Sequence, residues 1–375
     1  MRMRILVASL LLATASALVG APRAARAEKI TIDDDTFFNI GVLIQPQLLL
    51  GQKAAPDGGW TSDLFIRRGR LILSGQVDAH IGFVFITDEA NYGKANDLAA
   101  QFFIQDALAY YKFGPELTVD AGFMLLPFVR NNYVSAGGLH TIDFHTPVIK
   151  FPFNRAFRDF GVEARGLLLE DKIYYRAGVF NGVASRAGVD MPPAPPVAEL
   201  NGSDVPRVTG TVRYNIAGKE DAYAFPGIYF AKDPIISVGV GFDWQHESYG
   251  RDTDHVGLNA DVFADYPIDA DNELVAAAAF LHYNDYLSAG GPESANAFFV
   301  EAGYRIQMIE PIVSFENFKG DKTLRQSTLR LGLNWWISQH KYNLKAEVAV
   351  PFNEAPAGMD AKHDVTATVQ SQVSF

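Results

Sequence analysis

Arginines at alternating positions are the side chains in this sequence best suited to chemistry with a dissolved molecule. A guanidinium presents a planar fork of N–H donors and keeps its proton, so it can replace part of the water around an oxyanion. Several such contacts in series let an anion enter and leave without trapping it. The arginines that we place opposite the apolar side of their segments are Arg68, Arg70, Arg165, Arg176, Arg207 and Arg213.

A purely structural role is open to the same arginines. Glu163 and Asp78 fall on the same polar faces, and an arginine beside a carboxylate can hold two segments together instead of meeting a solute. The residues alone leave both roles open, so the next question is which elements position these side chains.

The last twelve residues show the kind of element. In Asp364 to Phe375, the residues Val365, Ala367, Val369, Val373 and Phe375 share one face, and Thr, Gln and Ser residues share the other. This period of two predicts a β-strand with one apolar face and one uncharged polar face. Such a strand is typical of an outer-membrane β-barrel, which meets lipid outside and water inside.

The rest of the chain repeats this pattern. We count sixteen predicted strands, the first from about Phe38 to Leu48, where Pro46 fits best at a bulge or a strand end. The connections alternate between long loops and short turns, as in bacterial outer-membrane barrels. One connection departs from this rule, because Ala217 to Lys232 should be short and is long. The inner face is ambiguous in the fourth strand, near Phe102 to Tyr111, and in the eleventh, near Ala277, because both faces carry apolar residues.

The N-terminus indicates export. Arg2 and Arg4 precede an apolar run from Ile5 to Val19, and Ala25-Arg26-Ala27 resembles a cleavage site. We therefore expect residues 1–27 to be a signal peptide and residues 28–375 to form one barrel domain. Removing the four arginines of residues 1–27 changes the formal charge from −11 to −15, which argues against nucleic acid as a partner. The sequence has no cysteine, so neither a disulfide framework nor a lipoprotein attachment site is present.

Five segments, taken in order, resemble a known family. They are F-I-R-R-G-R-L from Phe65, D-A-L-A-Y-Y-K-F-G-P-E-L from Asp106, A-G-F-M-L-L-P-F ending at Phe128, D-F-G-V-E-A-R-G from Asp159 and A-G-V-F-N-G from Ala177. Each is similar to a segment of the phosphate-selective porin O and P family, and the resemblance is clear over about residues 36–215. It implies a trimeric sixteen-stranded barrel whose third long loop folds into the lumen and whose inner arginines guide anions. The motif carries this role over to Arg67, Arg68, Arg70 and Arg165. The family's lysines near the pore entrance and exit have no counterpart that we identify here.

The third long loop, Pro127 to Phe157, is the connection that we most expect to have a function. About thirty residues are more than a hairpin needs. Its apolar residues could pack on the wall while its cations narrow the pore, and it could otherwise lie outside the barrel. The cations that we assign to this constriction loop are Arg130, Lys150 and Arg155.

Charge on the polar faces changes sign along the chain. The C-terminal strands place mainly acids inward, among them Asp243, Asp261, Asp265, Glu301, Glu316 and Glu347. A basic wall would then face an acidic one, and the resulting transverse field is typical of general diffusion pores. His140, Asp143 and His145 have metal-ligand residue types, but they lack an evident fourth ligand, so we expect no metal site.

The sequence thus predicts an all-β transmembrane barrel with a loop folded into its lumen. We expect a passive outer-membrane channel for small hydrophilic solutes, biased toward anions and with phosphate or polyphosphate as candidates. The expected partners are small anions, outer-membrane lipid, lipopolysaccharide and two further copies of the chain. We expect neither enzymatic activity nor a cofactor. The alternatives are a general or differently selective porin and a plugged structural or adhesive barrel.

Overall fold

The structure, a computed structural model, describes residues 28–52, 58–150, 157–182, 205–247, 254–288, 291–354 and 364–375. Sixteen antiparallel strands, β2 to β17, follow one another around a closed barrel, because β17 pairs with β2 and β9 pairs with β10. This confirms the predicted fold class. The strands are β2 (Phe37–Gly51), β3 (Thr61–Gln76), β4 (Ile81–Tyr92), β5 (Phe103–Gly114), β6 (Leu117–Leu125), β7 (Arg158–Leu168), β8 (Ile173–Phe180), β9 (Arg207–Ala217), β10 (Ile235–Gln245), β11 (His255–Pro267), β12 (Asn272–Ser288), β13 (Gly291–Ile306), β14 (Ile309–Gly320), β15 (Gln326–His340), β16 (Tyr342–Pro351) and β17 (Thr366–Ser374).

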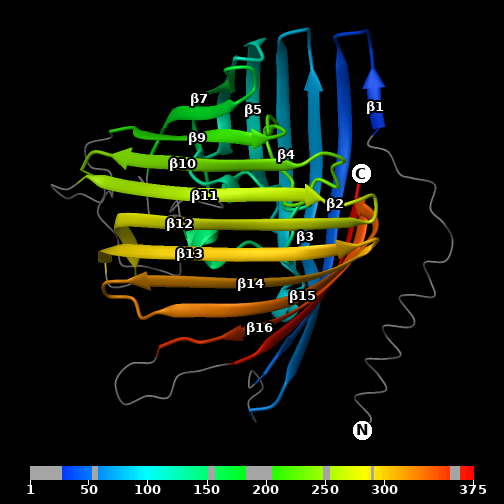
Figure 1. Ribbon diagram of the computed structural model, residues 1–375, viewed down its shortest axis with the longest axis vertical. Helices are drawn as coiled ribbons and strands as arrows, with labels where there is room; N and C mark the ends of the chain where they lie inside the picture. Colours follow the sequence, from blue (N-terminus) through cyan, green and yellow to red (C-terminus); the bar gives the residue numbers. More distant parts are fainter. Residues whose placement is uncertain are drawn as a thin grey trace.

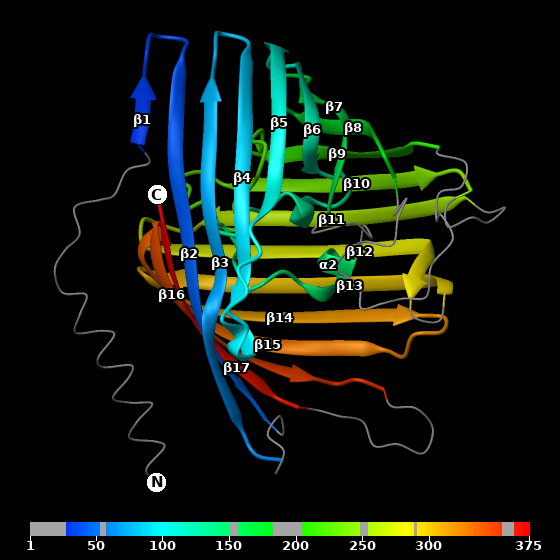
Figure 2. The same cartoon turned by 180° about the vertical axis from the view of Figure 1, so that it is seen from behind.

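Figures 1 and 2 show the barrel from two sides. The strands β2 to β5 run along the long axis of the view, whereas β10 to β14 on the opposite wall cross them at a steep angle. A short additional strand, β1 (Glu28–Thr31), pairs with the start of β2, next to the position where Phe375 exchanges backbone hydrogen bonds with Val42. The predicted signal peptide, residues 1–27, lies outside the described residues and stays a prediction.

Side-chain alternation along the strands agrees with the sequence pattern. In β17, Gln370 and Gln372 face inward and bond to Gln47 and Gln45 of β2, while Val373 is exposed on the outside. The register between β2 and β3 shifts between Gln45 and Pro46, which confirms the predicted bulge at the proline. A proline donates no ladder hydrogen bond, so a bulge is where a paired strand can accommodate it.

The helices of the described residues are η1 (Lys94–Asn96), η2 (Arg130–Asn132) and α2 (Thr146–Lys150). No helix in this part of the chain is long and apolar enough to cross a membrane. Both η2 and α2 belong to the connection between β6 and β7, which is the long loop singled out above.

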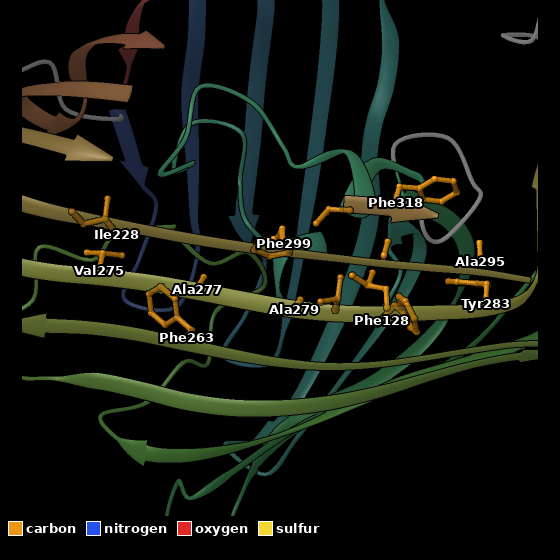
Figure 3. Packing of buried hydrophobic residues seen from close by; sticks show 14 of the residues in the cluster. Phe128, Ile228, Phe263, Val275, Ala277, Ala279, Tyr283, Ala295, Phe299 and Phe318 are labelled. Atoms are coloured by element: carbon orange, nitrogen blue, oxygen red, sulfur yellow. The ribbon is translucent and has the colours of Figure 1, made fainter. Parts of the chain in front are cut away.

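An apolar core lies inside the barrel against one wall. The inward side chains of β12 and β13 are small or apolar, including Ala277, Ala279, Ala297 and Phe299, and Phe128 and Ile228 of two connections pack on them. Figure 3 shows Ala277, Ala279 and Phe299 on these strands, with Phe128 and Ile228 beside them. This explains the ambiguous eleventh predicted strand, since β12 is apolar toward lipid and equally apolar toward the segments inside.

Candidate pore and the segments that enter it

Two connections enter the lumen from opposite ends of the barrel and meet inside it. Residues 126–150 come from the long-loop end, and residues 218–234 come from the short-turn end. We call them the upper and lower inserts. Their backbones pair where Phe225 N–H donates to Tyr133 O over 2.8 Å, Ser135 N–H to Phe225 O over 2.9 Å, and Gly227 N–H to Gly138 O over 2.7 Å. The predicted insertion of the long loop is confirmed, and the lower insert explains why the connection after Ala217 is long.

A buried ion pair strengthens this junction. Arg130 of the upper insert donates from Nε to Glu220 of the lower insert over 2.9 Å, and neither side chain has appreciable exposure. The Arg130 guanidinium also lies 3.4 Å from the centre of the Phe263 ring. Arg130 therefore joins the two inserts, and its predicted part in narrowing the pore stays a prediction.

The other two predicted loop cations have different surroundings. Lys150 donates to Gln326 over 3.0 Å and its ammonium group lies 3.8 Å from the centre of the Phe318 ring. It is thus held against the wall formed by β14 and β15. Arg155 falls outside the described residues.

Two histidines fasten the upper insert to the acidic wall. His145 Nε2 lies 2.8 Å from Glu301, and His140 Nε2 lies 2.8 Å from Glu310. Burial alone would lower the pKa of both histidines, but the carboxylates outweigh it and raise the pKa of His140 to about 10 and that of His145 to about 9. Both imidazoles are therefore cationic at neutral pH and neutralise part of the acidic wall. Among the described residues no group of His, Asp and Glu could hold a metal ion.

Three of the predicted arginines are fully buried and paired. Arg176 donates from Nε to Glu163 over 2.8 Å, Arg207 to Asp243 over 2.6 Å, and Arg213 from Nη1 to Asp261 over 2.5 Å. Arg176 also donates to the carbonyl of Tyr223 in the lower insert over 2.9 Å. These guanidinium groups already meet carboxylates, so the structure gives them an anchoring role, and their contact with a solute anion stays a prediction.

A β-bulge places two consecutive arginines at one carboxylate. Arg68 pairs with Gln45 and Ile66 with Pro46, so Arg67 is the extra residue of β3. The alternation breaks there, and both guanidinium groups reach Asp143 of the upper insert, Arg67 from Nε over 2.9 Å and Arg68 from Nη2 over 2.5 Å. Burial by itself would raise the pKa of Asp143, but the two guanidinium groups hold it well below its usual range.

The remaining predicted arginines lie nearer to open space. Arg70 donates from Nε to Asp88 over 2.9 Å, and Arg165 donates from Nε to Asp120 over 2.6 Å. Each carboxylate is on the strand next to its arginine, so these pairs stay on the wall. The predicted acids of the opposite wall are inward and buried as well, and Glu316 and Glu347 share Arg330. The two walls therefore match most of their charges locally.

Among the described residues, two cavities beside the inserts lie against β2 and β3. One of about 590 Å³ lies at the short-turn end, where Asn39 and Ser74 line it. The other, of about 260 Å³, lies at the long-loop end, where Gln47 and Phe65 line it. Arg68, Arg70 and Gln45 occupy the stretch of β2 and β3 between these two sets of residues. Both spaces lie along this wall, and Arg68 and Arg70 lie between them.

Sequence reasoning missed two parts of this site. Asp143 was considered as a metal ligand, whereas it binds the arginines of β3. The sequence marks the lower insert only by its irregular length, although Glu220 and Phe225 of this segment are buried in the structure and Tyr223 is partly buried. The departure from alternating loop length was the available signal.

Comparisons with known proteins place the fold. No family model and no curated protein matches the sequence. Among solved structures, the outer membrane channel DcaP of Acinetobacter baumannii aligns with a TM-score of 0.59 and 12% identity over 92% of this chain and 99% of that one. The anion-selective porin from Comamonas acidovorans aligns with a TM-score of 0.58 and 12% identity over 91% and 100%. Salmonella typhi OmpF, solved with daunomycin, aligns with a TM-score of 0.60 and 13% identity over 93% and 100%. The chain has the fold of outer-membrane porins, and its place in the phosphate-selective family stays a prediction.

Proposed function

We propose that the protein is a passive outer-membrane channel for small hydrophilic solutes. The observation that carries this proposal is the pair of cavities at opposite ends of β2 and β3, separated by charged side chains and not by the apolar core. Solutes would pass along this wall, while the inserts occupy the space next to β11 to β14. The barrel would reach the membrane after removal of residues 1–27, with its apolar outer face against lipid and its long loops near lipopolysaccharide.

Basic side chains favour a bias toward anions. Arg67, Lys94 and Arg330 line the cavity at the long-loop end together with the acids Asp143 and Glu347. The acids are fewer, so small anions would be enriched in this cavity. Phosphate and polyphosphate are members of this solute class that a guanidinium fork can bind through two hydrogen bonds. A homotrimer is the assembly proposed with this function.

A plugged barrel is the second candidate. It is favoured by the apolar core inside the lumen and by the buried Arg130–Glu220 pair, since both would hold the inserts in place. Such a barrel would present its long loops to a binding partner and conduct no ions. Measured conductance separates the two candidates.

The test is a recording of single channels in planar bilayers under a potassium chloride gradient. The proposal is supported by an anion-selective reversal potential together with a chloride current that added phosphate blocks. Arg67→Gln should weaken the block, whereas Lys319→Gln, at an exposed lysine that pairs with Glu354, should leave it unchanged. A near-zero or cation-selective potential would point to a general porin with a transverse field, and absence of conductance would point to the plugged barrel.

A further inference from the structure

The cavity at the short-turn end is built by the lower insert. Lys219, Asp221 and Tyr223 of that insert close one side of a space of about 590 Å³, and β2 to β8 form the rest. A short turn between β9 and β10 would leave this region open to the barrel mouth. The unusual length of the connection therefore produces a bounded compartment large enough for a ring-containing molecule.

Rings and aliphatic side chains form part of the lining of this compartment. Phe37, Val84, Leu167 and Tyr174 line it, and Tyr110 reaches it across Gly82. A Cβ atom at Gly82 would lie 2.2 Å from the end of the Tyr110 ring, so the glycine is what allows this ring position. Flat apolar groups gain from contact with such rings, both by leaving water and by stacking.

Cationic side chains that can donate hydrogen bonds also line this compartment. Lys112 lines the compartment, and no carboxylate of the described chain lies within ion-pair distance of its ammonium group. Arg165 donates to Asp120 from Nε and Nη2, which leaves Nη1 without a partner among the described residues. Lys219 is different, because Asp171 lies 2.9 Å away and Asp221 3.7 Å away. These two acids are about half exposed, so Lys219 and water screen them, and the donors that remain are Lys112 and Arg165.

From this juxtaposition we infer that the compartment binds small cyclic carboxylates, molecules with one apolar ring and a carboxylate. The ring lies against the apolar side chains of the lining, and the carboxylate accepts from Lys112 or from Arg165 Nη1. A short-chain acid lacks the ring contact, and a ring-bearing cation would face these two donors. The inference rests on the proposed function, since it specifies a class of solute that the channel would admit.

The experiment compares three probes on the purified full-length protein. Benzoate carries the ring and the charge, acetate only the charge, and benzylammonium the ring with the opposite charge. In planar bilayers, benzoate should reduce the chloride current at concentrations where acetate and benzylammonium do not. The reduction should require less benzoate when it is added from the short-turn side.

Two variants and one control assign the block to this compartment. Lys112→Gln should raise the benzoate concentration for half block by about threefold, the effect expected for one exposed charge. Arg165→Lys keeps a cation beside Asp120 but removes the free fork donor, and should also weaken the block. Lys172→Gln removes the same charge from an exposed residue of the neighbouring turn, outside the lining, and should leave the block unchanged.

A second measurement does not depend on conduction. Saturation-transfer NMR on the detergent-solubilised barrel should show magnetisation passing to the benzoate ring, less strongly in Lys112→Gln than in Lys172→Gln. Equal transfer to benzylammonium, or no transfer to benzoate, would overturn the inference even if the protein conducts ions. Transfer to benzoate in a barrel without conductance would instead keep the site and reject the proposed channel.

Discussion

The two inner walls of this barrel differ in the side chains that they turn toward the lumen. The wall of β2 to β8 borders both cavities and carries guanidinium groups, each held by a carboxylate on the same wall or on the upper insert. The wall of β11 to β14 faces the inserts. Its strands β12 and β13 carry small apolar residues such as Ala277 and Ala295, and its acids Glu301 and Glu310 are held by histidines of the upper insert. A lumen side chain must meet water or protein, and here the choice follows from what lies opposite it. Apolar inner faces thus mark where an insert packs, whereas inward charges either border open space or pair with a buried partner.

The largest loss of stability is expected when a charge is placed among the small apolar residues of β12. Ala279→Asp should lower the free energy of unfolding by roughly 5 kcal/mol, because the carboxylate would be buried against the inserts without a partner. Ser74→Asp, on the cavity wall, should cost far less because water reaches the new group. Thermal unfolding of both variants in detergent, followed by circular dichroism, measures the difference. Equal losses would contradict the contrast between the walls.

Removing the pair between the two inserts should have the next largest effect. Arg130→Met leaves the buried Glu220 carboxylate without its main partner, and should cost about 3–4 kcal/mol. The double variant Arg130→Met with Glu220→Leu should regain part of this loss, because no uncompensated charge remains. Urea unfolding of the single and double variants measures the coupling. If the double variant lost as much as the two single variants added together, the pair would not join the inserts.

Alkaline pH should loosen the upper insert on the acidic wall. The pKa values of His140 and His145 are raised in the folded protein, so their stabilising contribution is complete below the unfolded value near 6.5. It is lost as pH rises through about 9 and 10, where the imidazoles lose their protons beside Glu301 and Glu310. Melting temperature should therefore fall over this interval, and the fall should be smaller in His140→Gln with His145→Gln. An unchanged pH profile in that variant would show that other groups control it.

A clear effect on selectivity, with a smaller loss of stability than Arg130→Met causes, should come from Asp143→Asn, because Asp143 and Arg67 are partly exposed and Arg130 and Glu220 are not. The change keeps the side-chain volume but removes the charge that neutralises Arg67 and Arg68. The anion-to-cation permeability ratio should rise by about two- to threefold, since one further positive charge faces the cavity. Asp254→Asn, on an exposed segment at the same end, is the control and should leave the reversal potential unchanged. A shift of the same size in both variants would mean that total charge, and not the site, sets selectivity.

Much of the fold was predictable because a membrane barrel imposes a regular code. Lipid outside and water inside force a period of two, so sixteen strands and the alternation of loop lengths could be read from the chain. The pattern no longer predicts the inner face where a strand does not have water on its inner side. The inward side of β12 meets protein, and Val275, Ala277 and Ala279 therefore look like a second outer face.

The candidate site was less predictable. The inward arginines were found from alternation, but the bulge at Arg67 reverses the alternation locally, and only the register of β2 and β3 reveals it. The partner of that arginine pair, Asp143, is distant in sequence and lies on a loop without a period. The lower insert carries no repeat that predicts where its backbone runs. Such contacts depend on how two irregular segments fit together, and a periodic pattern contains no information on that.

The junction of the inserts also bears on how the barrel is assembled. Tyr133 and Phe225 can pair only when β6 to β10 have brought the two ends of the lumen into register, whereas the seam between β2 and β17 joins the two ends of the chain. Forming the seam last would let the remaining strands wrap around an interior that is already folded. We therefore expect amide protons of the inserts to gain protection from exchange with solvent water before those of β2 and β17 during refolding. The inserts would then act as a template for closure, a role that ends once the barrel is complete.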